Sequence, residues 1–172
     1  MSTIHQIRQA PIAGVFALVL SCIASAAHAD GFDCQAHNTG LRIHVANSTN
    51  PHLGTRTPEA MTVVNPLLKP DQQEIVKFTR ENRTLTYLGR GSYLGSVDRR
   101  FLDSGRQGEN IAGTKLGHLK SILLDIEFSY AHSDIELANS VKEVPAKIFY
   151  QKRTGEILEE AASCKRFLNP WP

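Results

Sequence analysis

The sequence has few of the residues that mark several protein classes. Its 172 residues include three cysteines, two methionines and one tryptophan, and aromatic residues make up 7% of the chain. Glycine and proline follow no repeat, which excludes collagen-like and low-complexity proteins. With 41% hydrophobic and 21% charged residues, the chain is also unlike the broadly disordered class. The composition is that of an ordinary globular chain.

An excess of one charge is also lacking. The formal net charge is +2, and the most basic stretch, residues 90–120, holds six basic against three acidic side chains. Nucleic-acid-binding domains usually carry a much larger basic excess. We therefore expect no nucleic-acid partner.

Only one long apolar run occurs, from Ile12 to Ala24, and it is short of the roughly 20 residues that a membrane-spanning helix requires. A weakly basic start precedes it, and Ala27-His28-Ala29 follows with small residues at the two positions that a signal peptidase reads. We predict a secretory signal peptide over residues 1–29, cleaved before Asp30. The mature protein is then periplasmic or secreted and has no transmembrane segment.

Residues 18–22, Leu-Val-Leu-Ser-Cys, allow a second interpretation of the same segment. They resemble a bacterial lipobox, which would make Cys22 a lipidated N-terminus. Leu20 directly before Ser21 fits that motif poorly, and the Ala-His-Ala site fits cleavage better.

Two cysteines remain after cleavage, Cys34 and Cys164, near opposite ends of the mature chain. Export places them in an oxidising compartment, and two cysteines allow one intramolecular pairing. We therefore predict a Cys34–Cys164 disulfide, whose loop closure is worth about 5 kcal/mol in the chain-entropy model. Because a bridge needs Cα atoms within about 7 Å, the first and last elements must be neighbours.

Alternating apolar and polar residues predict a series of β-strands. The clearest lies at residues 122–130, and Gly89-Arg90-Gly91 predicts a hairpin turn between two others. Residues 156–168 fit either a helical stripe or a strand, and the preceding turn at 153–155 favours the strand. Residues 133–136 could cap one short helix. The remaining expected strands lie around Cys34 and at residues 41–46, 60–65, 73–79, 84–88, 93–97 and 144–150.

The spacing of these segments predicts the fold class. We expect an all-β fold over residues 30–172, forming one domain closed by the disulfide. It is an antiparallel sandwich or a closed barrel of about seven to eight strands, with at most one short helix.

Common catalytic and cofactor motifs are absent from the sequence. There is no Gly-x-Ser-x-Gly elbow, the mature cysteines are expected to be oxidised, and the histidines lack metal-site spacing. The glycines of residues 89–95 precede strand-like residues rather than a helix, and residues 108–115 only approach a phosphate-binding loop. We expect no cofactor and no metal; the sequence leaves catalysis open and favours its absence.

The least regular segment runs from Asp98 to Gly117 and holds four glycines and seven charged residues. Long loops are often functional, and arginine guanidinium groups suit a carboxylate or phosphate ligand, although neighbouring acidic residues could pair with them instead. A second polar loop at residues 54–58 could join this surface. The candidate ligand-binding residues are Arg56, Arg99, Arg100, Arg106, Glu109 and Lys115.

The two cysteines, together with residues 54–56, 103–106 and 108–117, resemble a group of short exported bacterial β-rich proteins without an assigned activity. The resemblance implies export and a single β-rich domain, and it carries over no catalytic residue.

The sequence therefore favours an exported binding or interaction module that contacts an unknown envelope component or protein through its Arg/Gly-rich loop. The alternatives are an envelope-directed hydrolase using Asp98, Asp103 or Glu109, and a purely structural envelope protein.

Overall fold

The computed structural model describes residues 28–50, 55–98, 108–127 and 143–170. Nine strands form one antiparallel sheet in the order β4-β3-β2-β1-β11-β10-β9-β6-β5, and two short strands form a separate hairpin. Two 3-10 turns, η1 (Pro70–Gln72) and η2 (Leu116–His118), are the only helical elements within these ranges. The strands are β1 (His28–Ala36), β2 (Arg42–Asn50), β3 (Thr55–Val64), β4 (Glu74–Thr79), β5 (Leu85–Gly89), β6 (Ser92–Ser96), β7 (Asn110–Ile111), β8 (Thr114–Lys115), β9 (Leu119–Ile126), β10 (Val144–Lys152) and β11 (Ile157–Pro170).

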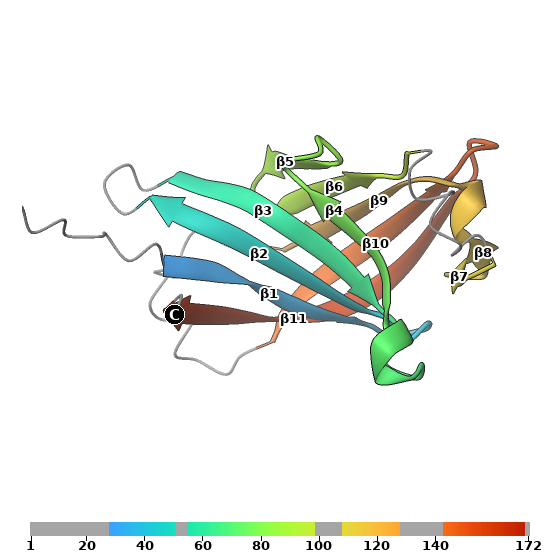
Figure 1. The fold of residues 1–172 in the computed structure, drawn as a ribbon, viewed down its shortest axis with the longest axis horizontal. Helices are drawn as coiled ribbons and strands as arrows, with labels where there is room; N and C mark the ends of the chain where they lie inside the picture. Colours follow the sequence, from blue (N-terminus) through green and yellow to red (C-terminus); the bar gives the residue numbers. More distant parts are fainter. Residues whose placement is uncertain (1–27, 51–54, 99–107, 128–142, 171–172) are drawn as a thin grey trace, which may run out of the picture.

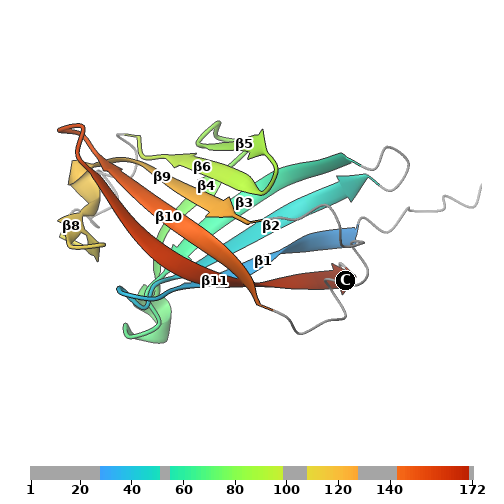
Figure 2. The ribbon, with the colours of Figure 1, turned by 180° about the vertical axis from the view of Figure 1, so that it is seen from behind.

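The all-β prediction is confirmed, and the large sheet curls into a nearly closed barrel (Figures 1 and 2). Its edge strands, β4 and β5, are consecutive in the chain and are joined by a tight turn. There the Thr84 amide donates to the Thr79 carbonyl at 3.1 Å, and the Thr79 amide donates to Thr84 Oγ1 at 3.0 Å. The sheet has nine strands rather than seven or eight, and each segment in which the sequence predicted a strand contributes one of them.

Side chains alternate between the barrel interior and its outer face, as the sequence pattern requires. In β10 the residues Val144, Ala146, Ile148 and Tyr150 are buried, and their neighbours are more exposed. The ambiguous C-terminal segment is a strand, β11, because it pairs with both β1 and β10. The hairpin predicted at Gly89-Arg90-Gly91 joins β5 to β6. The expected helix start at residues 133–136 lies outside the described residues.

The predicted disulfide is present between Cys34 and Cys164. The two residues lie directly opposite each other across β1 and β11, with Cα atoms 3.9 Å apart and no exposed surface. The first and last strands of the chain are therefore both paired and covalently joined in the middle of the sheet.

The packing of β3 and β4 against β6, where the barrel nearly closes, depends on Gly95 in β6. A Cβ atom there would lie 2.5 Å from the Phe78 ring and 2.6 Å from Met61 Cε. Because glycine has no Cβ, the side chains of β4 and β3 lie directly against the β6 backbone.

The β7–β8 hairpin and η2 cover one end of the barrel beside the β10–β11 turn (Figures 1 and 2). Ile111 and Leu116 are fully buried in the core. Arg153 anchors this cover, because its amide donates to the His118 carbonyl at 2.8 Å and its Nε donates to the Gly117 carbonyl at 3.1 Å. Residues 110–118 are thus ordered core-packing structure, whereas the sequence predicted an irregular loop.

Within the described ranges, no helix has the length and apolar character needed to cross a membrane.

Candidate functional site

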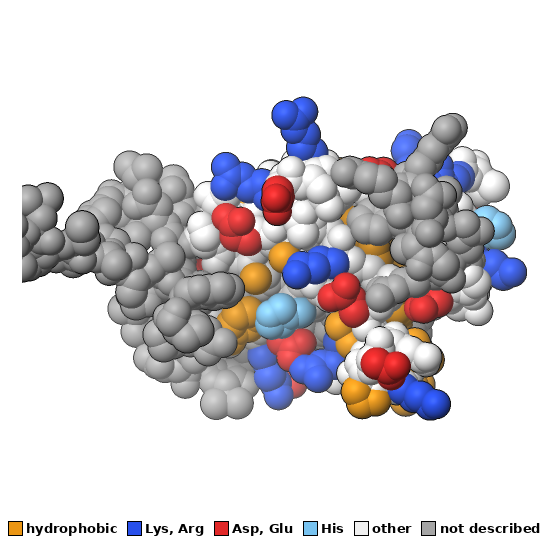
Figure 3. All heavy atoms as spheres, viewed as in Figure 1, with side chains coloured by type: hydrophobic (Ala, Val, Ile, Leu, Met, Phe, Trp, Pro, Cys, Tyr) orange, Lys and Arg blue, Asp and Glu red, His pale blue; other side chains and the backbone are white. Residues whose placement is uncertain are grey.

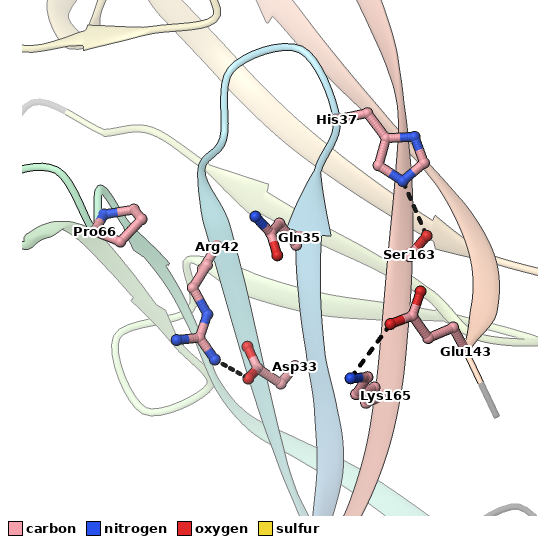
Figure 4. Close-up of a pocket in the computed structure, with 8 residues that line it drawn as sticks. All are labelled: Asp33, Gln35, His37, Arg42, Pro66, Glu143, Ser163 and Lys165. Atoms are coloured by element: carbon pink, nitrogen blue, oxygen red, sulfur yellow. Dashed lines mark hydrogen bonds and ion pairs between the residues drawn. The ribbon is translucent and has the colours of Figure 1, made fainter. Parts of the chain in front are cut away.

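The outer face of the sheet is hollowed where β2, β1 and β11 run side by side (Figure 4). The groove encloses about 440 Å³ and is open to solvent. Its floor consists of the outward-facing residues of the three strands, since the alternate residues face the core. The lining residues are Asp33, Gln35, His37, Arg42, Pro66, Glu143, Ser163 and Lys165.

Four charged side chains of alternating sign cross the groove, and we call them the charge row: Arg42, Asp33, Lys165 and Glu143. Arg42 forms an ion pair with Asp33, and Lys165 Nζ lies 3.3 Å from Glu143 Oε1 (Figure 4). Asp33 and Lys165 face each other in the β1–β11 register, so the two pairs are neighbours.

The ion pairs of the charge row are exposed and therefore weak. The Arg42 and Asp33 side chains are 50% and 33% exposed, and those of Lys165 and Glu143 are 59% and 54% exposed. Exposed pairs of this kind contribute about 0–1 kcal/mol to stability. A charged partner can therefore exchange with them at low cost.

A histidine and a serine also meet in this groove. His37 Nε2 lies 2.9 Å from Ser163 Oγ (Figure 4), a distance at which histidine can act as a base toward a hydroxyl nucleophile. Ser163 lies in the central strand β11, opposite Gln35 on one side and Pro145 on the other. Because the strand ladder engages the backbone on both sides of Ser163, the described residues present no pair of free amides beside it for an oxyanion hole.

A buried network fixes the β1–β2 turn that carries His37. The Glu160 carboxylate accepts hydrogen bonds from the Asn38 and Thr39 amides at 3.1 and 3.0 Å and from Thr39 Oγ1 at 2.8 Å. It also accepts one from the Tyr150 hydroxyl at 2.5 Å. Burial, and then the neighbouring Glu160, raise the pKa of Tyr150 above its ordinary value near 10.

An aromatic pair borders the groove on the same outer face. The His44 and Phe167 rings stack with centroids 4.7 Å apart and an interplanar angle of 8°. Gly31 makes this possible, because a Cβ there would lie 2.5 Å from the Phe167 ring. His44 lies opposite Asp33 in the β1–β2 register, so the stack adjoins the charge row.

On the face of the molecule seen in Figure 3, the acidic and basic side chains of the described residues are also intermingled.

Of the predicted site residues, Arg56, Glu109 and Lys115 lie in the described part of the chain, and they do not lie together. Arg56 lies near the start of β3, at the end of the barrel opposite β7 and β8 (Figure 1). Residues 55–58 therefore belong to a strand, not to the expected loop. Arg99, Arg100 and Arg106 lie outside the described residues.

Glu109 and Lys115 flank the β7–β8 hairpin. Lys115 is exposed and pairs with Asn110 in register. Glu109 is partly buried, and its Oε2 atom is buried without a hydrogen-bond partner. Both residues therefore lie on the element that covers the end of the barrel.

The groove was not predicted from the sequence, since its lining combines residues 33–66 with residues 143–165, which lie far apart in the chain. Most of them occupy polar positions in strands with alternating apolar and polar residues. Because most outward-facing residues do the same, this pattern does not distinguish the groove.

The described part of the chain contains no cluster of three histidine, cysteine, aspartate or glutamate residues that could hold a metal ion. No protein-family model, curated protein or solved structure matches this chain.

Proposed function

We propose that this chain is an exported binding module that holds an envelope component in the groove across β2, β1 and β11. The observation that carries the proposal is the charge row, which presents two cations and two anions at the surface of an open groove. The internal disulfide is compatible with an oxidising compartment outside the cytoplasm.

The chemistry of the groove favours a partner that carries charges of both signs. Such a partner can pair with Arg42 and Lys165 and with Asp33 and Glu143 together, so that no charge of the row loses its counter-ion. The His44–Phe167 stack beside the row adds a flat aromatic surface, which is common in binding interfaces. A protein segment with mixed charges has these properties.

The test is capture of envelope components from the source organism on the full chain, purified after export. The groove variant is Arg42→Glu/Lys165→Glu, and the matched control is Arg80→Glu/Lys147→Glu. The control makes the same change in charge at two exposed ion pairs outside the groove lining, Arg80–Glu59 and Lys147–Glu159.

We expect a component that wild type and control retain and that the groove variant loses, with bound material identified by mass spectrometry. Equal capture by all three proteins would contradict the groove as the site. Capture of nothing by any of them would contradict tight binding and favour a purely structural envelope protein.

A second candidate function is an envelope-directed hydrolase, and the observation that favours it is the His37–Ser163 contact at 2.9 Å. Its test is hydrolysis of an activated ester such as p-nitrophenyl acetate by wild type and by Ser163→Ala. The binding proposal expects equal rates for both proteins, because Ser163 lacks an oxyanion site. A rate that falls at least tenfold in Ser163→Ala would favour the hydrolase.

A further inference from the structure

Four buried polar residues from four strands meet inside the barrel, at the end opposite the β7–β8 hairpin. We call them the interior cluster: Asp30 of β1, Asn47 of β2, Tyr93 of β6 and Arg166 of β11. Their exposed fractions are 2%, 1%, 1% and 8%. Asp30 and Asn47 face each other across β1 and β2, near the start of β1 and the end of β2.

The interior cluster links strands that are distant in the sheet. Arg166 Nη2 donates to Asp30 Oδ2 at 2.8 Å, and Asn47 Nδ2 donates to the Tyr93 hydroxyl at 3.2 Å. The second bond crosses the barrel interior, because β2 and β6 are not neighbours in the strand order.

The side-chain oxygen of Asn47 is a buried acceptor without a donor. Asn47 Oδ1 is buried and accepts no hydrogen bond, while the amide nitrogen of the same side chain is already engaged with Tyr93. Buried polar atoms almost always have a partner, and an exception in a native fold calls for a water, an ion or a ligand. The bond to Tyr93 explains the amide nitrogen of Asn47 and leaves its oxygen to be satisfied.

We propose that the interior cluster binds a small neutral molecule that carries hydroxyl groups, one of which donates to Asn47 Oδ1. Barrels of about this strand number can hold one small ligand, and barrel mouths are common places for such sites. This site is separate from the outer groove and goes beyond the proposed function.

The charges of the interior cluster argue that the ligand is neutral. Arg166 and Asp30 cancel each other as an ion pair whose side chains are 2% and 3% exposed. A charged ligand would itself have to be desolvated in this buried place, which is unfavourable. A hydroxyl group supplies the missing donor without a net charge.

The test follows the protein by ¹⁵N NMR while glycerol or D-ribose is added to the full chain purified after export. We expect saturable shifts of the Asn47 side-chain amide and of the Asp30 and Tyr93 backbone amides. Trimethylglycine, which has no hydrogen-bond donor, is the control ligand and should leave these signals in place.

Variants separate a ligand site from a general solvent effect. Asn47→Leu should abolish the saturable shifts of Asp30 and Tyr93, and the matched variant Asn110→Leu, at an exposed asparagine of β7, should retain them. Tyr93→Phe keeps the ring but releases the Asn47 amide. Tyr93→Phe should weaken polyol binding about tenfold, as expected for the loss of one positioning hydrogen bond. This variant still tests the proposal if Asn47→Leu does not fold.

The absence of a saturable shift with either polyol would overturn the proposal, and a single internal water at Asn47 Oδ1 would then be the explanation. Shifts that persist in Asn47→Leu would overturn it as well. The groove variant Arg42→Glu/Lys165→Glu should leave the polyol response unchanged, so this proposal and the proposed function can fail independently.

Discussion

Glu160 and Asp30 show how single buried carboxylates are accommodated in this barrel. Glu160 accepts four hydrogen bonds from two backbone amides and two hydroxyl groups, whereas Asp30 is paired with the Arg166 guanidinium. Burying a charge without such partners is costly, so each carboxylate has its own set of donors. Glu160 thereby holds the β1–β2 turn from inside, and that turn places His37 at the groove.

Tyr150 gives a prediction about pH. Its hydroxyl is buried against Glu160, and burial keeps its pKa above the ordinary value near 10. Above about pH 10 the unfolded chain releases this proton and the folded chain keeps it, so the free energy of unfolding falls as the pH rises. The slope from this group approaches 1.4 kcal/mol per pH unit, by a rough estimate.

Tyr150→Phe isolates this contribution in chemical unfolding at several pH values. Below pH 10 the wild type should be more stable than the variant by about 1–2 kcal/mol, from the hydroxyl bond to Glu160. This difference should shrink as the pH rises toward the raised pKa. A difference that stays constant up to pH 11.5 or so would contradict the raised pKa.

Among the structural elements, the positions of strands could be predicted from the sequence wherever one face of the strand packs in the core. Alternation identified the segments of β2, β9 and β10, and turn residues identified the β5–β6 hairpin. The β7–β8 cover was missed because Ile111 and Leu116 are the only buried apolar residues in an otherwise polar stretch. Two buried residues on either side of a tight turn are too few to form a periodic pattern.

The groove was not predictable for a different reason. Asp33 and Lys165 are 132 positions apart in the numbering, yet they are direct partners across β1 and β11. The predicted disulfide made the first and last elements neighbours, but the register between them decides which polar side chains meet. A shift of one residue would turn Asp33 toward the core.

Gly95 supports a prediction about barrel closure. Gly95→Ala places a Cβ against the Phe78 ring and Met61, both fully buried, so the packing of β3 and β4 on β6 must shift. We expect a loss of about 1–3 kcal/mol in the free energy of unfolding, measured with urea. The control is Gly108→Ala, where a Cβ would meet nothing within 4 Å and the change should stay within about 0.5 kcal/mol. Equal effects at the two positions would contradict close packing at Gly95.

The disulfide supports a second prediction at this scale. Cys34 and Cys164 are 130 residues apart and already paired in the ladder, so the bond acts mainly by restricting the unfolded chain. Cys34→Ala/Cys164→Ala should lose about 5 kcal/mol of unfolding free energy. A reducing agent should lower the stability of the wild type by a similar amount and leave the double variant unchanged. A loss below about 1 kcal/mol would mean that the two strands stay associated in the unfolded state.

At the scale of the whole molecule, the barrel has two different ends. The β7–β8 hairpin and η2 cover one end with apolar side chains, and the buried interior cluster lies at the other. The outer groove lies on the side of the barrel, over the disulfide-linked strands β1 and β11. The proposed groove site therefore lies on the outer face of the barrel, and the proposed polyol site lies in its interior. Because they are in different places, the two proposals can be tested separately.

The last prediction concerns export of the whole chain. We predict cleavage between Ala29 and Asp30, which would remove two residues of β1 that pair with Asn169 and Pro170 at the end of β11. The pairing of Asp30 with Asn47 and Leu168, and every pair beyond it, would remain. The intact mass of the exported protein should therefore correspond to residues 30–172 with one disulfide.

Ala29→Phe should block processing, because the peptidase requires a small residue at that position. Cys22→Ser should leave processing unchanged, whereas loss of processing in Cys22→Ser, or an acylated protein beginning at residue 22, would favour the lipoprotein instead.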